Sequence, residues 1–337
     1  MIKKIVIALV VLLVLSLSAW KLFFQAPTIE DDLKQMNLAM TSYHMEGNME
    51  IGEGEEVRKF YVCVDFKQGE TDNFRISLTD KDINQEQILL RNDKGVYVLT
   101  PVLNQVYTFK GDYPLNSNKP YLYHSFMKAL DGDYEVSKLQ DGYLISYDVT
   151  YDNEPTWVTQ EVKFSKELKP VWTYIYNKEH NIAAKVLFTK VDFAPTYEEN
   201  YFDVDANMKL AKENVSSSYV STSVNDLPFL PVSYSEESVL KEQTKVVENG
   251  KVSYILTYEG VKSYTVFQSI IDKSNVESYE SIMVDSEIIM TTYGISFIDG
   301  KCLKYIYNDM SYEIYSKDLS TSEMIGVIKT MEMAGVK

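Results

Sequence analysis

Few side chains in this sequence could act as nucleophiles or metal ligands, and they lie far apart. The chain of 337 residues contains three histidines, His44, His124 and His180, and two cysteines, Cys63 and Cys302. No two histidines are four residues apart, as a pair of metal ligands on one helix would be. Each cysteine has apolar or aromatic neighbours, which favours a buried small side chain over a nucleophile or a disulfide. We therefore predict structural roles for these residues and no metal site.

The sequence motifs of common enzyme and cofactor sites are also missing. The stretch GISFI at 294–298 lacks the second glycine of the G-x-S-x-G nucleophile motif, and neither a P-loop nor a G-x-G-x-x-G occurs. The stretch from Asp203 begins like a calcium-binding loop, but Met208 stands in place of the turn glycine and Asn214 in place of the bidentate glutamate. The sequence therefore predicts a protein that is not an enzyme and uses no cofactor.

The charge of the chain excludes one class of partner. The net charge is −16 at pH 7, and lysine and arginine never cluster beyond two adjacent residues. An acidic surface is repelled by phosphate backbones and gains nothing from counterion release, so nucleic acid is not an expected partner. Anionic lipid headgroups would repel it too, so any membrane association must depend on a hydrophobic segment.

An apolar segment near the N-terminus can provide that membrane association. Residues 5–24 are apolar apart from two serines and one lysine, and about 20 such residues span a bilayer as a helix. Lys3 and Lys4 precede the segment, so the positive-inside rule places the rest of the chain outside the cytoplasm. We predict a transmembrane anchor over 1–25 and a single-pass cell-membrane protein with an extracytoplasmic body. The alternative is a signal peptide that is cleaved before Ala19.

After the anchor the spacing of apolar residues changes from helical to strand-like. Residues 28–43 begin with a Thr-x-x-Asp cap and place apolar side chains at helical intervals, which predicts an amphipathic helix. From residue 44 onward apolar and polar side chains alternate, as in strands with one buried face. Two of these strands, 58–66 and 74–78, place large apolar residues on one face: Phe60, Val62, Val64, Phe66, Phe74, Ile76 and Leu78.

Further strands joined by short polar turns predict an antiparallel meander. We expect a hairpin at 88–99 and a short helix at 121–130 that interrupts the meander. A stretch rich in serine and threonine predicts a linker at 208–226, followed by a smaller domain at 227–337 that ends in a capped helix.

Several stretches of the first predicted domain resemble the LolA/LolB/RseB family of lipoprotein-handling proteins. These are VYVLTPVLNQVYTF at 96–109 and YPLNS at 113–117, with Phe74-Arg75 upstream where the family carries an aromatic-basic pair. The order of helix, meander, short helix and meander over 28–207 is also similar.

The second predicted domain resembles the small domain that follows LolA-like domains in membrane proteins of Gram-positive spore-formers. The resemblance rests on LPFLPVSY at 227–234 and on the closing helix. Relatives such as GerS act in sporulation or germination, so the resemblance implies a role of that kind.

The resemblance implies a β-dominated α+β fold. It consists of an N-terminal transmembrane helix, an unclosed antiparallel β-barrel with a helical lid over 28–207, and a smaller β-sheet-plus-helix domain. The family's concave apolar face would hold lipid or lipoprotein acyl chains or would dock an envelope protein. The candidate groove lining is Phe60, Val62, Val64, Phe66, Phe74, Arg75, Ile76 and Leu78. The stretch KQGET at 67–71 departs from the family pattern, which leaves Arg75 as the one basic candidate.

Two functions remain open from the sequence. In the first, the groove captures lipid or a lipoprotein, although a permanently anchored chain could not shuttle between membranes. In the second, the protein regulates a cell-wall enzyme or senses envelope stress through protein contacts, and its core is filled by its own side chains.

Overall fold

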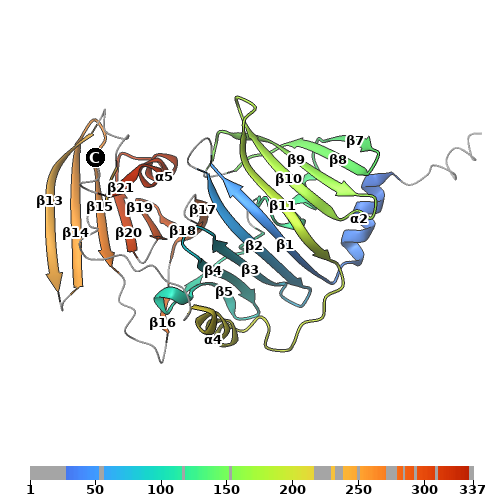
Figure 1. The fold of residues 1–337 in the computed structure, drawn as a ribbon, viewed down its shortest axis with the longest axis horizontal. Coiled ribbons are helices and arrows are strands. Elements are labelled where there is room, and N and C mark those ends of the chain that lie inside the picture. The colour runs from blue at the N-terminus through green and yellow to red at the C-terminus, as the bar shows by residue number, and fades with distance from the viewer. Residues whose placement is uncertain are drawn as a thin grey trace, which may run out of the picture. The chain divides into compact units, whose positions relative to one another are not determined.

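The computed structural model describes residues 28–52, 57–115, 118–151, 154–215, 229–231, 238–248, 251–270, 279–283, 285–291, 294–307 and 310–333 (Figure 1). The chain divides into two compact units, Met1–Met40 and Thr41–Lys337. The predicted anchor at 1–25 and residues 216–226 of the predicted linker lie outside the described residues. Within these ranges no helix combines the length and the apolar composition that a membrane span requires.

The first unit contains the helix predicted after the anchor. Helix α2 spans Ile29–Ala39 and begins with a capping box, in which the Asp31 amide donates to Thr28 Oγ1 at 3.3 Å and the Thr28 amide donates to the Asp31 carboxylate at 3.1 Å. The helix ends before Tyr43, which the sequence pattern predicts as its last residue. Met40 already has extended backbone, and the period-two alternation of a strand begins at Ser42.

The larger sheet has twelve strands in the order β16-β6-β5-β4-β3-β2-β1-β11-β10-β9-β8-β7. The strands are β1 Ser42–Ile51, β2 Arg58–Lys67, β3 Asn73–Asp80, β4 Gln85–Asn92, β5 Gly95–Thr100, β6 Gln105–Phe109, β7 Glu135–Leu139, β8 Gly142–Asp148, β9 Trp157–Ser165, β10 Pro170–Asn177, β11 Ile182–Asp192 and β16 Glu280–Met283. Among the described residues the end strands β16 and β7 do not pair with each other, so the sheet does not close into a barrel.

One strand makes this sheet mixed rather than wholly antiparallel. β16 comes from the C-terminal part of the chain and pairs parallel with β6, with Glu280 opposite Gln105 and Met283 opposite Thr108. The remaining neighbours are antiparallel, as the meander of short turns predicted. The sequence pattern predicts a strand at 281–284, which β16 matches closely, but it assigns that strand to the second domain and does not predict its pairing with β6.

The smaller sheet has seven antiparallel strands in the order β13-β14-β15-β20-β19-β18-β17. They are β13 Ser238–Glu248, β14 Lys251–Gly260, β15 Tyr264–Ile270, β17 Glu287–Thr291, β18 Gly294–Asp299, β19 Cys302–Tyr307 and β20 Met310–Ser316. Helix α5, Thr321–Lys329, begins with the predicted Ser320–Glu323 capping box and shares a hydrophobic core with this sheet. Two short strands, β12 Phe229–Pro231 and β21 Met331–Met333, form a separate pair.

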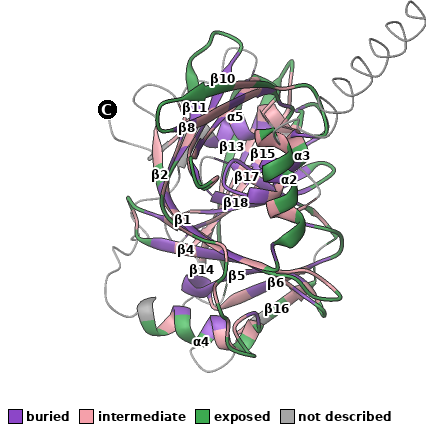
Figure 2. Ribbon diagram, turned by 90° about the vertical axis from the view of Figure 1, so that its right-hand side faces the viewer, coloured by how far each residue is buried: buried purple, intermediate pink, exposed green. Residues whose placement is uncertain are grey.

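Three helical segments interrupt the first sheet's connections. They are the 3-10 turn η1, Pro101–Leu103, helix α3, Tyr123–Ala129, and helix α4, Val204–Val215. Helix α3 confirms the helix predicted at 121–130 with slightly tighter ends. Helix α4 was not predicted. Its buried residues Met208 and Ala211 pack with Ile88, Leu90 and Leu99, so α4 covers one face of β4 and β5 (Figures 1 and 2).

The two faces of the first sheet are set by the register of β1, β2 and β3. Val64 lies opposite Met45 on one side and Ile76 on the other, so these apolar residues share a face, which we call the inner face. Asp65 lies opposite His44 and Arg75, and these residues share the opposite face, which we call the outer face.

Candidate functional site

Seven of the eight predicted groove residues lie on the inner face and are buried. Their exposed fractions do not exceed the 4% of Phe66, and they are Phe60, Val62, Val64, Phe66, Phe74, Ile76 and Leu78. The residues of β1 that face them, including Tyr43, Met45 and Met49, are buried as well. The inner face is therefore a continuous apolar surface that other parts of the chain cover.

Helix α3 covers one end of the inner face. The ring centroid of His124 lies 4.6 Å from that of Phe66, 5.3 Å from that of Phe74 and 5.6 Å from that of Tyr43. The Tyr43 hydroxyl is also 3.1 Å from His124 Nδ1. Burial lowers the pKa of His124 to about 4, so this imidazole is neutral at pH 7 and packs as an aromatic ring.

Strand β18 of the smaller sheet covers the other end. The Phe297 ring lies 4.8 Å from that of Tyr107 and 5.1 Å from that of Phe109, both on the first sheet. The side chain of Gln87 forms two hydrogen bonds with the backbone of Ile295, donating to its carbonyl at 3.0 Å and accepting from its amide at 2.8 Å. These contacts attach the smaller sheet to the inner face near Phe60 and Leu78.

Gly294 lies at this junction and fits closely. Its φ is +91°, and a Cβ at this position would stand 2.3 Å from Gln87 Oε1 and 3.8 Å from Phe60 Cε1. Only glycine fits without moving a buried side chain, because Gln87 is 6% exposed and is held by its two hydrogen bonds.

Arg75, the eighth predicted groove residue, lies on the outer face. Its Nε donates to Asn207 Oδ1 at 2.6 Å, and its Nη2 lies 3.5 Å from Glu86. Its Nη1 is 3.9 Å from Asp65. Because side chains alternate along a strand, Arg75 points away from its neighbours Phe74 and Ile76 and belongs to a different group of residues.

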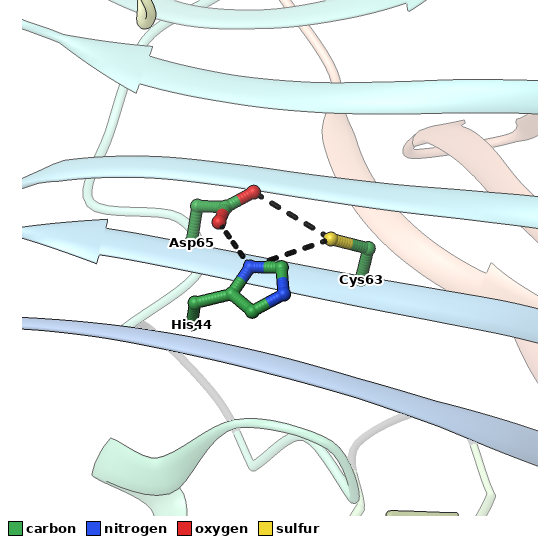
Figure 3. A group of neighbouring side chains, drawn as sticks. All are labelled: His44, Cys63 and Asp65. Atoms are coloured by element: carbon green, nitrogen blue, oxygen red, sulfur yellow. Dashed lines mark hydrogen bonds and ion pairs between the residues drawn. The ribbon is translucent and has the colours of Figure 1, made fainter. Parts of the chain in front are cut away.

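That group is a polar cluster on the outer face, formed by His44, Glu46, Cys63, Asp65 and Arg75. Figure 3 shows three of its members, His44, Cys63 and Asp65. His44 stands between two carboxylates, with Nδ1 2.7 Å from Asp65 and Nε2 2.6 Å from Glu46. Asp65 has no exposed surface. The cluster is therefore a network of hydrogen-bonded charged groups around a buried carboxylate rather than a set of solvated charges.

Two tyrosines from the segment between β11 and α4 cover Asp65. The Tyr197 hydroxyl donates to Asp65 at 3.2 Å, and the Tyr201 hydroxyl donates to it at 2.8 Å. Their rings pack on each other at 4.7 Å. A buried carboxylate requires such donors, because an unpaired buried charge costs several kcal/mol.

The cluster does not have the geometry of a cysteine nucleophile with its base. Cys63 Sγ lies 4.0 Å from His44 Nδ1, the same nitrogen that faces Asp65, whereas a catalytic triad uses opposite nitrogens for nucleophile and carboxylate. Burial, together with the charge of Asp65, raises the pKa of the Cys63 thiol well above its usual range, so the thiolate is disfavoured. The hydrogen bond to Asp65 raises the pKa of His44.

The alternation in the predicted strand 58–66 puts Cys63 and Asp65 on the face opposite Val62 and Val64, but it does not bring His44 to them. His44 and Asp65 meet because β1 and β2 form a hairpin in the register that also pairs Glu46 with Cys63. The available signal was the polar parity of β1, on which His44 and Glu46 alternate with apolar residues. The tyrosine cover had no signal at all, because Tyr197 and Tyr201 lie outside any strand.

The architecture defines the class of protein as β-dominated α+β, with a twelve-stranded mixed sheet and a seven-stranded antiparallel sheet. No protein-family model matches the chain. The chain is 30% identical over 299 residues to the sporulation protein YdcC of Bacillus subtilis. The matched region is 87% of this chain and 86% of that protein. The chain therefore belongs to the family of this sporulation protein, and the predicted relationship to sporulation proteins is confirmed.

Three solved structures illustrate the fold likeness. The Pseudomonas aeruginosa MucA/MucB complex matches at 12% identity, with 91% of this chain and 99% of that chain covered and a TM-score of 0.33. A putative outer membrane lipoprotein-sorting protein domain from Vibrio parahaemolyticus matches at 11% identity, with 52% of this chain and 97% of that chain covered and a TM-score of 0.25. The structure of the Clostridioides difficile CwlD amidase in complex with the GerS lipoprotein matches at 14% identity, with 52% of this chain and 97% of that chain covered and a TM-score of 0.19.

These structures are of the kinds that the sequence resemblance named, namely a lipoprotein-sorting protein and GerS. TM-scores this low carry no argument about function. The family assignment therefore rests on the sporulation relative.

Proposed function

We propose that this chain is a membrane-anchored, extracytoplasmic and non-catalytic protein that docks an envelope protein during sporulation. Its inner face, the counterpart of a LolA-like groove with a helical lid, is filled by its own side chains. The observation that carries this proposal is the burial of the inner face, from Phe66 and Phe74 under α3 to Phe60 beside β18.

The burial of the inner face favours the second of the two functions left open by the sequence, in which the core is filled by its own side chains. A groove that holds acyl chains needs an accessible apolar cavity, usually of several hundred Å³. Here the seven apolar candidates are at most 4% exposed, and His124 occupies the space above Phe66 and Phe74. Acyl binding would require α3 or β18 to move away, whereas docking a protein on an exposed surface requires no such opening.

The anchor, the export and the sporulation setting have separate support. The anchor and the orientation rest on the apolar segment 5–24 and its lysine flank. The sporulation setting rests on the relative's name. The choice of a protein partner rests on the filled inner face, which leaves the exposed surfaces of the sheets for binding.

The test uses the full-length chain in sporulating cells. A photo-crosslinking amino acid at the exposed residues Leu187 of the first sheet or Val247 of the second should yield a discrete adduct with one envelope protein. Native mass spectrometry of the detergent-purified chain should then show no bound acyl species. A stoichiometric lipid or lipoprotein on the purified chain, without a protein adduct, would refute docking and support acyl capture.

A further inference from the structure

The polar cluster on the outer face holds three different metal-ligating atoms close together. His44 Nδ1, Cys63 Sγ and an Asp65 carboxylate oxygen all lie within 4.8 Å of one another (Figure 3). They come from two adjacent strands, and Asp65 is fully buried while His44 and Cys63 are partly exposed. An incoming ion could therefore reach two of the three ligands from solvent.

The spacing of these atoms is close to that of a tetrahedral site. With metal–nitrogen bonds of about 2.0 Å and metal–sulfur bonds of about 2.3 Å, ligand atoms stand roughly 3.3–3.7 Å apart. Sγ is 3.6 Å from Asp65 Oδ2 and 4.0 Å from His44 Nδ1. The 2.7 Å between Nδ1 and Asp65 Oδ1 is a hydrogen-bond distance, which a small side-chain rotation would widen once an ion replaces the proton.

The surroundings orient the imidazole for such a site. Glu46 accepts from His44 Nε2 at 2.6 Å, which keeps a proton on Nε2 when an ion displaces the proton that Nδ1 shares with Asp65. Glu46 is itself held by Lys190 at 3.2 Å and by the Tyr61 hydroxyl. A carboxylate behind a histidine ligand is the usual support of a bound metal ion.

We propose that His44, Cys63 and Asp65 bind one thiophilic divalent cation, for which Zn²⁺ fits best. Binding displaces the thiol proton of Cys63 and any proton on His44 Nδ1, and both leave to solvent while Nδ1, Sγ and a carboxylate oxygen coordinate the ion. Imidazole and thiolate ligands select Zn²⁺ over Mg²⁺ or Ca²⁺.

The charges around the site accept a cation. The guanidinium of Arg75 is 3.9 Å from Asp65 and also contacts Glu86 at 3.5 Å and Asn207 at 2.6 Å, so Glu86 offsets part of its charge. With the Asp65 carboxylate and Cys63 as thiolate, the ligand set is anionic, and a divalent ion neutralises it. This proposal does not depend on the docking function.

The experiment titrates the reduced full-length chain in detergent with Co²⁺, which takes zinc sites and reports thiolate coordination by a charge-transfer absorption band. We expect the band to saturate at one Co²⁺ per chain and to disappear when Zn²⁺ is added. Wild-type protein without this band, or without stoichiometric binding, would overturn the proposal.

Matched variants locate the ion. Cys63→Ser should abolish the band, and His44→Gln, which also tests the site if Cys63→Ser does not fold, should weaken Co²⁺ binding strongly. Glu46→Gln should weaken it about 10- to 100-fold, as loss of a supporting carboxylate does. Cys302→Ser and His180→Gln, which change the other free cysteine and a histidine in a turn, should bind as wild type. A band that survives Cys63→Ser, or that vanishes with Cys302→Ser, would contradict the assignment.

Discussion

The two faces of β1, β2 and β3 carry alternate residues of the same stretches of chain, yet they are covered in different ways. On the inner face Val64 and its apolar neighbours are buried by packing of apolar and aromatic side chains, with the His124 ring of α3 at one end and Phe297 at the other. On the outer face Asp65 is buried by partners, because His44, Tyr197 and Tyr201 satisfy its carboxylate. The comparison teaches that apolar burial tolerates no charge, whereas polar burial tolerates a charge only with its full set of donors.

A charge on the inner face should have the largest effect. Val64→Asp should destabilise the fold by about 4 kcal/mol or more, because Val64 is 1% exposed and has only apolar cross-strand neighbours. Urea denaturation followed by circular dichroism measures the loss. Val239→Asp, at a valine that is 67% exposed, is the control and should change stability by less than about 0.5 kcal/mol. A stable Val64→Asp protein would mean that the inner face opens to solvent.

The fit between the two sheets should come next. Gly294→Ala should cost about 2–4 kcal/mol, because the methyl group would meet Gln87 and the backbone at φ +91° disfavours alanine. Gly300→Ala is the matched control, since Gly300 also has a positive φ but no atom within 4 Å of its Cβ position. Equal losses in the two variants would show that backbone strain alone is responsible and that the close fit at Gln87 contributes nothing.

On the outer face, Asp65→Asn should cost about 2 kcal/mol by weakening the hydrogen bonds from His44 and the two tyrosines. Because the hydrogen bond to Asp65 is the largest cause of the raised pKa of His44, an NMR titration should show that pKa fall in the variant. Asp93→Asn, at an exposed turn residue, should change neither quantity. An unchanged pKa of His44 in the variant would show that the hydrogen bond to Asp65 does not raise it.

The smallest effect is expected for a polar pair that water still reaches. Lys262, together with the Ser320 cap, lowers the pKa of Glu323 from 4.5 to about 2. The pair therefore stabilises the fold fully above about pH 5, and that contribution is lost as the pH falls toward 2. Glu323→Gln keeps the cap but should cost about 0.5–1 kcal/mol at pH 7.

Thermal melting of Glu323→Gln and wild type from pH 7 to pH 2 tests this sign. The two curves should converge at the acid end. Glu259→Gln removes the partner of Lys241, in an ion pair that is more exposed than Lys262–Glu323, and should differ less from wild type in melting temperature at pH 7. Curves that diverge toward low pH would reverse the expected linkage.

The sequence predicted what depends on local pattern. The alternation of Phe60, Val62 and Val64 predicted a strand with one buried face, and Ser320 with Glu323 predicted the start of α5. Helix α4 was missed although Val204, Met208 and Ala211 have helical spacing, because the neighbouring serines and threonines suggested a linker. Strand β13 was missed because most of its residues are exposed, which leaves no alternation to read.

What remained hidden depends on register and on contacts between distant segments. Nothing local reveals that His44 stands opposite Asp65, since that follows only when the β1–β2 register is known. The predicted domain boundaries at 208–226 stay a prediction, as does the assignment of the inner-face residues to a binding groove.

The pairing of β16 with β6 has a consequence for the order of events as the chain is made. β6 forms the edge of the first sheet until residues 280–283 have been made. Gln87 cannot form its hydrogen bonds until Ile295, 208 positions further along the chain, has been made. Because the chain is made from its N-terminus, the first sheet has an open β edge and an uncovered apolar face until the later segment is made. Both are features on which other chains can aggregate. Full burial comes only near the end of synthesis, so the edge of β6 and part of the inner face stay uncovered until residues 280–297 have been made.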